Sequence, residues 1–109
     1  MNDNFQCIYK ILKTLEAAMD YPEFDISQIS HEKLEISKYR WACYLEMMLD
    51  SGYIKGLKIF IDVTGEICVH NEGIKITFKG LEFLTENYIM QRIHKKAMGV
   101  VQVVSALKP

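Results

Sequence analysis

The chain has 109 residues, half of them hydrophobic, and its 13 Lys and Arg against 14 Asp and Glu give a formal net charge of −1 at pH 7. A chain of this length can bury its own core as one domain, and this composition excludes disordered polyelectrolytes and collagen-like chains. The apolar runs are much shorter than the ~20 residues that span a bilayer, and the first ten residues lack the pattern of an export signal, so we expect a cytoplasmic protein with no membrane partner.

The first predicted element is an amphipathic helix over residues 4–19. Pro22 ends it, because proline has no amide to donate and disfavours helical geometry in Tyr21. The alternation in residues 24–26 then predicts a short strand, and Ser30 is a suitable N-cap for a brief helix over residues 30–34. The inward face of the first helix, with apolar residues at spacings of three and four, consists of Phe5, Ile8, Tyr9, Leu12, Leu15 and Met19.

A second long helix is predicted between Ser37, a good N-cap, and Gly52, which suits the left-handed conformation that closes a helix. Together with the brief helix over residues 30–34, it predicts a helix-turn-helix. The inward face of this second helix consists of Trp41, Leu45, Met48 and Leu49. Its outward face consists of Tyr39, Arg40, Cys43, Glu46, Met47 and Asp50.

Strands and a further helix follow. Residues 57–63 and 66–70 alternate as strands do, with a tight turn at Thr64 and Gly65, and residues 74–76 form a third extended piece. Thr77 is a suitable cap for the next helix, whose inward residues are Leu81, Leu84 and Tyr88. The predicted fold class is therefore α+β: a winged helix made of a helix-turn-helix and a β-hairpin wing, with an additional C-terminal helix.

The end of the chain carries its most regular apolar pattern. Six residues step by three and four, as at the a and d positions of a coiled coil: Met90, Ile93, Ala97, Val100, Val104 and Leu107. The seam is short, and Gly99 weakens a helix by about 1 kcal/mol relative to Ala, so the seam must pack on another surface. We therefore predict a winged-helix domain, residues 1–87, and a C-terminal amphipathic helix, residues 88–109, packed on its own domain or at a dimer interface. Of the two, we favour the homodimer, in which the seam pairs with the first helix or with the seam of the other copy.

Two motifs resemble a known family. They are residues 47–56 (MMLDSGYIKG) and residues 76–87 (ITFKGLEFLTEN), and the segments over residues 8–12 and 22–25 are similar too. Together they resemble the YjcQ family, small proteins of Gram-positive bacteria and their phages. The resemblance covers nearly the whole chain and implies a winged-helix fold, a phage or prophage gene context and no established catalytic residues. Residues 100–104 are more apolar than a typical tail of this family.

DNA binding is the function to consider first for such a fold. In a helix-turn-helix the first turns of the second helix approach the major groove, where Arg40 can contact a guanine, and Lys38 or Tyr39 a phosphate. Glu46 and Asp50 would meet phosphates repulsively, which leaves shallow contact by the first turn. The wing candidates are Lys55, Lys58, Lys75 and Lys79, and further positive charge lies in Arg92, His94, Lys95 and Lys96. The alternative is that these lysines only keep a sheet edge soluble.

Other chemistry is poorly supported by the sequence. Cys68 and His70 stand two apart on a predicted strand, but a structural zinc site needs four ligands and no second pair of suitable spacing exists, so we predict no metal. Cys7, Cys43 and Cys68 are odd in number and lie in apolar segments, unlike a secreted disulfide framework. No nucleophile with its base, paired carboxylates or phosphate-binding loop occurs. We predict no enzyme and no cofactor.

Two functions remain. The first is a DNA-binding regulator or accessory factor of phage or prophage type. The second is a protein-interaction module that keeps the winged-helix shape without DNA binding and uses its C-terminal helix and its acidic N-terminal half, where residues 1–50 hold 9 acidic residues against 5 Lys and Arg. Salt dependence separates them, because phosphate contacts weaken as salt rises and apolar interfaces respond little.

Overall fold

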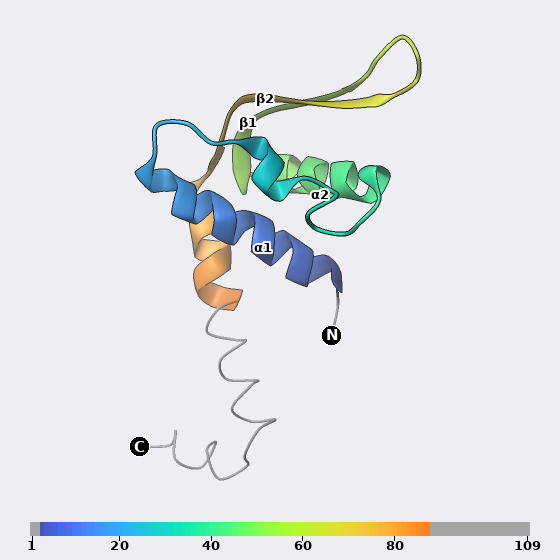
Figure 1. Cartoon of the computed structure of the whole chain (residues 1–109). Coiled ribbons are helices and arrows are strands. Elements are labelled where there is room, and N and C mark those ends of the chain that lie inside the picture. Colours follow the sequence, from blue (N-terminus) through green and yellow to red (C-terminus); the bar gives the residue numbers. More distant parts are fainter. Residues whose placement is uncertain (1–2, 88–109) are drawn as a thin grey trace, which may run out of the picture.

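The structure is a computed structural model that describes residues 3–87 of the chain (Figure 1). Helix α1 (Asp3–Ala17) continues into a 3₁₀ turn, η1 (Ala18–Asp20), directly before Pro22, as predicted. Two residues of its predicted inward face lie elsewhere: Phe5 is 56% exposed and Met19 59% exposed. The face that does enter the core consists of Cys7, Ile8, Ile11, Leu12 and Leu15.

The segment between α1 and the second long helix differs from the prediction. Residues 24–26 form no strand; the Asp25 carboxylate accepts a hydrogen bond from the Ser27 amide at 3.0 Å and starts a 3₁₀ helix, η2 (Ile26–Ile29). The predicted helix over residues 30–34 is a hydrogen-bonded turn, since Glu35 adopts a left-handed φ of 57° that ends any helical path. The first half of the helix-turn-helix is therefore η2 and one turn.

Helix α2 (Lys38–Asp50) has the predicted ends. The Ser37 hydroxyl accepts a hydrogen bond from the Arg40 amide at 3.1 Å, and Gly52 has a φ of 80°. Trp41 Nε1 donates to the Ile29 carbonyl at 2.7 Å, which ties η2 to α2. The predicted outward face is confirmed, since all six of its residues are exposed.

The wing is an antiparallel hairpin of β1 (Ile54–Ile61) and β2 (Ile67–Ile76), so the extended pieces predicted over residues 66–70 and 74–76 form one strand. A bulge interrupts the pairing, because Lys55 lies opposite Lys75 whereas Leu57 lies opposite Asn71. The Asn71 side chain stabilises this bulge, accepting hydrogen bonds from the amides of Gly73 and Ile74 at 3.0 and 2.8 Å. The bulge restores the alignment of apolar residues with the core on both sides of the irregularity.

A helix over residues 78–87 follows β2 and begins at Thr77, as predicted. The Thr77 hydroxyl accepts a hydrogen bond from the Gly80 amide at 3.1 Å and donates to the Gly52 carbonyl, while its own amide donates to the Tyr53 carbonyl at 3.0 Å. Thr77 therefore caps one helix and joins it to the turn that ends α2. These hydrogen bonds are the structural role of Thr77 in the Ile-Thr-x-x-Gly motif, residues 76–80.

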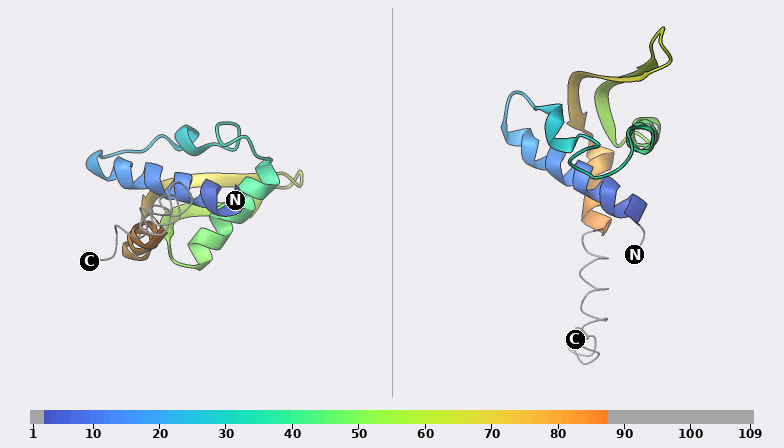
Figure 2. Two further views of the ribbon diagram at one scale, coloured as in Figure 1. Left: turned by 90° about the horizontal axis from the view of Figure 1, so that it is seen from below. Right: turned by 45° about the vertical axis from the view of Figure 1, so that its right-hand side comes forward.

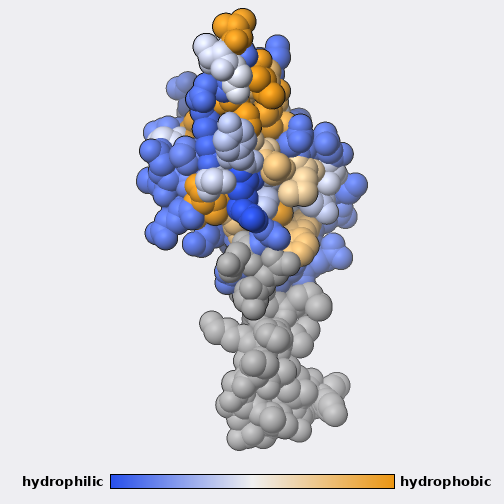
Figure 3. Space-filling view, turned by 90° about the vertical axis from the view of Figure 1, so that its right-hand side faces the viewer, coloured by the Kyte–Doolittle hydropathy of each residue, from blue (hydrophilic) through white to orange (hydrophobic). Residues whose placement is uncertain are grey.

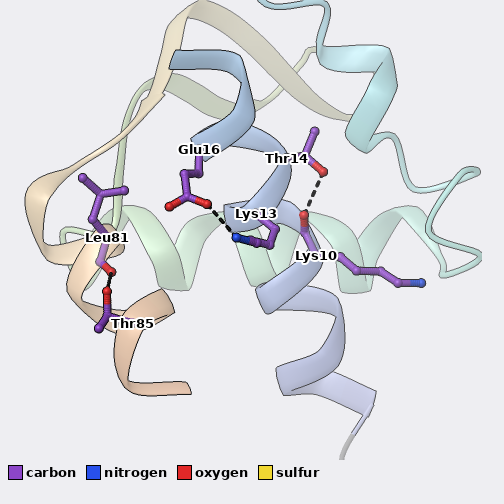
Figure 4. Close-up of polar contacts among 6 residues, drawn as sticks. All are labelled: Lys10, Lys13, Thr14, Glu16, Leu81 and Thr85. Atoms are coloured by element: carbon purple, nitrogen blue, oxygen red, sulfur yellow. Dashed lines mark hydrogen bonds and ion pairs between the residues drawn. The ribbon is translucent and has the colours of Figure 1, made fainter. Parts of the chain in front are cut away.

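The views in Figures 1 and 2 show the hairpin above the helices and the 78–87 helix crossing beside α1. Polar contacts on the outer sides of these two helices are local: Lys13 pairs with Glu16 at 2.8 Å, and the Thr14 and Thr85 hydroxyls donate to carbonyls in their own helices (Figure 4).

The α+β winged helix with a further C-terminal helix is confirmed. No helix within residues 3–87 is both long and apolar enough to span a bilayer. The predicted seam and the rest of residues 88–109 lie outside the described residues.

Candidate functional site

Three of the predicted DNA contacts lie in the first turn of α2, and their side chains differ in what they contact. Lys38 and Tyr39 are exposed, Tyr39 by 65%. Arg40 is exposed too, but its guanidinium turns toward α1, where Nη1 donates to Asn4 Oδ1 at 2.8 Å and to the Tyr44 hydroxyl at 3.1 Å. The Tyr44 hydroxyl also donates to Asn4 Oδ1. Arg40 therefore joins the starts of α1 and α2, and contact with a base requires it to give up these bonds.

The wing lysines gather on the face of the hairpin that points away from the core. Lys55 lies directly opposite Lys75, and Lys58 lies opposite His70, with all four side chains exposed. Within residues 3–87 none of these lysines forms an ion pair. Like charges directly opposite each other destabilise a hairpin, so this pairing carries an energetic cost without an internal compensation.

The remaining predicted contacts flank this face. Lys79 lies at the start of the 78–87 helix, and a Cβ at Gly52 would lie 3.8 Å from Lys79 Cδ. Lys38 lies at the opposite end of the hairpin, close enough to Cys68 for its charge to act on the pKa of that thiol. The seven predicted residues therefore do not form one patch. Lys55, Lys58 and Lys75 form a cluster, Lys79 borders it, and the α2 residues lie toward the wing end.

Cys68 is a weak nucleophile in this setting. Desolvation and the neighbouring Asp62, whose Oδ2 lies 3.6 Å from Cys68 Sγ, raise the pKa of the thiol against the opposing effect of Lys38. Its strand neighbour His70 is exposed, and within residues 3–87 no three His, Cys, Asp or Glu side chains meet as ligands of a metal would.

The turn at the wing end is closed by Asp62. Its carboxylate accepts hydrogen bonds from the Thr64 hydroxyl at 2.6 Å and from the Glu66 and Thr64 amides at 3.0 and 2.8 Å, and these bonds lower the pKa of Asp62. A lowered folded pKa means that the stabilisation is complete above the unfolded value of about 3.9 and is lost as pH falls through the folded pKa.

We therefore expect the wing turn to loosen only in strong acid. In an NMR titration the amide shifts of Thr64 and Glu66 should change with a midpoint below pH ~3.9, and Asp62→Asn should abolish that transition. Glu66→Gln removes a carboxylate from the same turn but none of these bonds, so the transition should persist in that variant. A midpoint above pH ~4 would contradict the assigned role of Asp62.

A groove between α1 and α2 was missed by sequence reasoning. It has a volume of about 540 Å³, and its apolar walls include Phe5, Ile8, Tyr39 and Met47. The available signal was the pair Met47 and Met48, of which Met48 is core and Met47 is half exposed. The departure of Phe5 from the core stripe depends on how α1 crosses α2, which one sequence does not show.

A second apolar surface lies at the end of the wing. Phe60, Ile61 and Val63 are 43%, 69% and 103% exposed, as side chains that project from the turn and the last residues of β1. Figure 3 shows hydrophobic residues at the wing end and again over the middle of the same side of the molecule. The side that presents the start of α2 therefore carries hydrophobic residues at two places between hydrophilic flanks, which sequence reasoning did not predict.

The sequence matches the model of a known protein family. A family model described as YjcQ protein matches residues 9–102. The chain belongs to the YjcQ family. No curated protein and no solved structure matches the chain. The YjcQ match includes α2, the wing and all four predicted wing lysines, whereas Asn4 and Phe5 of the groove precede it.

Proposed function

We propose that the chain is a cytoplasmic, non-enzymatic DNA-binding protein, a regulator or accessory factor of phage or prophage type. The observation that carries the proposal is the lysine cluster on the outer face of the wing, where Lys55 and Lys75 oppose each other. Such a pair weakens the hairpin, and an anionic ligand would relieve the repulsion. A phosphate backbone is the ligand that a winged helix most commonly meets with its wing.

The geometry suits phosphate contact better than base reading. Lys55 and Lys58 are three residues apart on β1, or about 10 Å, so neighbouring phosphates can engage both. Glu46 and Asp50 are exposed on the second half of α2 and oppose deep entry into a major groove. We infer shallow, weakly sequence-specific binding, with Lys38 and Tyr39 touching the duplex at the start of α2. Four such lysine contacts correspond to a salt slope of about −3.6.

Reversing two wing charges should test this directly. We expect the double variant Lys58→Glu, Lys75→Glu to bind a pool of random duplexes at least tenfold more weakly than the parent at about 50 mM salt, with a salt slope reduced by about 2, because each lysine neutralises one phosphate. Fluorescence anisotropy between about 50 and 200 mM salt measures both quantities.

The matched control is Lys10→Glu, Lys33→Glu. It changes the net charge equally, and both side chains are exposed on α1 and the turn before α2, away from the wing. It should lose much less affinity than the wing variant. If both variants lose the same affinity, binding depends only on the net charge of the protein and not on the wing. If the parent does not bind at about 50 mM salt, DNA binding is refuted.

The second candidate is a protein-interaction module. The exposed apolar side chains of the groove and of the wing end favour it, because large apolar side chains on one side of a small protein commonly mark a partner surface. Its signature is binding that persists as salt rises, together with no affinity for duplex DNA.

A further inference from the structure

The α1–α2 groove has the form of a docking site for a helix. On α2 its wall is the stripe Tyr39, Cys43 and Met47, which are spaced by four and extend over about 12 Å. Phe5 and Ile8 of α1 form the opposite wall. The exposed fractions of Phe5, Tyr39 and Met47 are 56%, 65% and 50%, so these side chains have room for further burial.

The polar end of the groove holds its two walls in place. Asn4 Oδ1 accepts hydrogen bonds from both Arg40 and Tyr44, which joins the first turn of α1 to α2 across 36 and 40 residues of sequence. The groove is thus formed before any ligand arrives. A preformed groove of two helical turns is the geometry in which an amphipathic helix buries residues spaced by three and four.

Charge indicates which helix fits. Glu46 and Asp50 are exposed at the rim beside Met47, and neither forms an ion pair within residues 3–87. Residues 1–87 hold 9 Lys and Arg and all 14 acidic residues, a formal charge of −5, whereas residues 88–109 hold 4 Lys and Arg and no acidic residue. The ligand expected at this rim is apolar on one face and cationic beside it, which describes the C-terminal segment of this chain.

We propose that the groove binds the C-terminal seam of a second copy of the chain. Ile93, Ala97 and Val100 enter between Phe5 and Met47 in this arrangement. Arg92 and Lys96, which are four residues apart on one flank of the seam, meet Glu46 and Asp50. Each copy offers one groove and one seam, so a two-fold dimer satisfies both sites. This proposal does not depend on DNA binding.

The first test is the oligomeric state of the full chain by size-exclusion chromatography with light scattering. We expect a dimer for the parent, and at least a tenfold rise in the dimer dissociation constant for Met47→Glu and for Ala97→Glu. Met19→Glu is the matched control, because Met19 is similarly exposed but lies in η1, beyond the far end of α1, and this variant should remain dimeric. Circular dichroism shows whether each variant stays folded.

A charge exchange tests the rim and does not depend on core packing. Glu46→Lys with Asp50→Lys should weaken the dimer, as should Arg92→Glu with Lys96→Glu, and combining all four substitutions should restore it. A monomeric parent would overturn the proposal. So would a dimer that survives Met47→Glu but is lost in Ala97→Glu, because the seams would then pair with each other and not with the groove.

Discussion

Gly56→Ala should lower the free energy of unfolding by about 3 kcal/mol, combining ~1–2 kcal/mol of left-handed backbone strain with ~1–3 kcal/mol for an overpacked contact. Gly56 has a φ of 78°, and a Cβ at this position would lie 2.2 Å from the carbonyl oxygen of Gly73. The neighbour is backbone on the paired strand, so relief requires the bulge itself to move. Thermal unfolding measures the loss, with a midpoint about 12 °C or more below the parent.

Gly65→Ala is the control that separates the two causes. Gly65 has a φ of 87°, similar to that of Gly56, but a Cβ there meets nothing within 4 Å. It should therefore show only the conformational strain, about 1–2 kcal/mol. If the two variants lose equal stability, the close contact between Gly56 and Gly73 does not contribute, and the bulge tolerates a side chain.

The elements that the sequence predicted correctly depend on side chains that act on nearby backbone. Ser37 and Thr77 each accept an amide hydrogen bond from the residue three positions later, and Gly52 closes α2 with a positive φ. These contacts span a few residues, so spacing alone reveals them. The apolar periodicity also predicted α2 correctly, because a helix that packs along one face has apolar residues at regular spacing in its sequence.

The failures arise where two local solutions compete or where distant segments meet. Asp25 and Ser30 are chemically able to cap α-helices, but here they begin a 3₁₀ helix and a single turn. The groove is a stronger example, because Asn4 contacts Arg40 across 36 residues and redirects a guanidinium that the sequence alone assigned to DNA. The residues around Asn4 and around Arg40 do not indicate this contact. Which residues form the candidate site could therefore be learned only from the structure.

Gly80→Ala should destabilise the protein by about 2 kcal/mol, although alanine within a helix usually gains about 1 kcal/mol over glycine, because Gly80 is buried against its neighbours. A Cβ at Gly80 would lie 2.4 Å from the Tyr53 carbonyl oxygen and 2.6 Å from Ile76 Cγ1. The Tyr53 carbonyl already accepts the Thr77 amide, so displacing it loosens the junction of the 78–87 helix with the turn after α2. Chemical denaturation measures the change.

The matched control is Glu82→Ala, an exposed position two residues later in the same helix, where the change should be within about 0.5 kcal/mol of neutral. The sign of the Gly80 effect decides the meaning of the motif. If Gly80→Ala stabilises the protein, glycine at this position does not serve close packing, and the Ile-Thr-x-x-Gly sequence acts through Thr77 alone. If it destabilises as expected, Thr77 and Gly80 act as one unit: the hydroxyl caps the helix, and the missing side chain lets that helix approach the backbone that Thr77 binds.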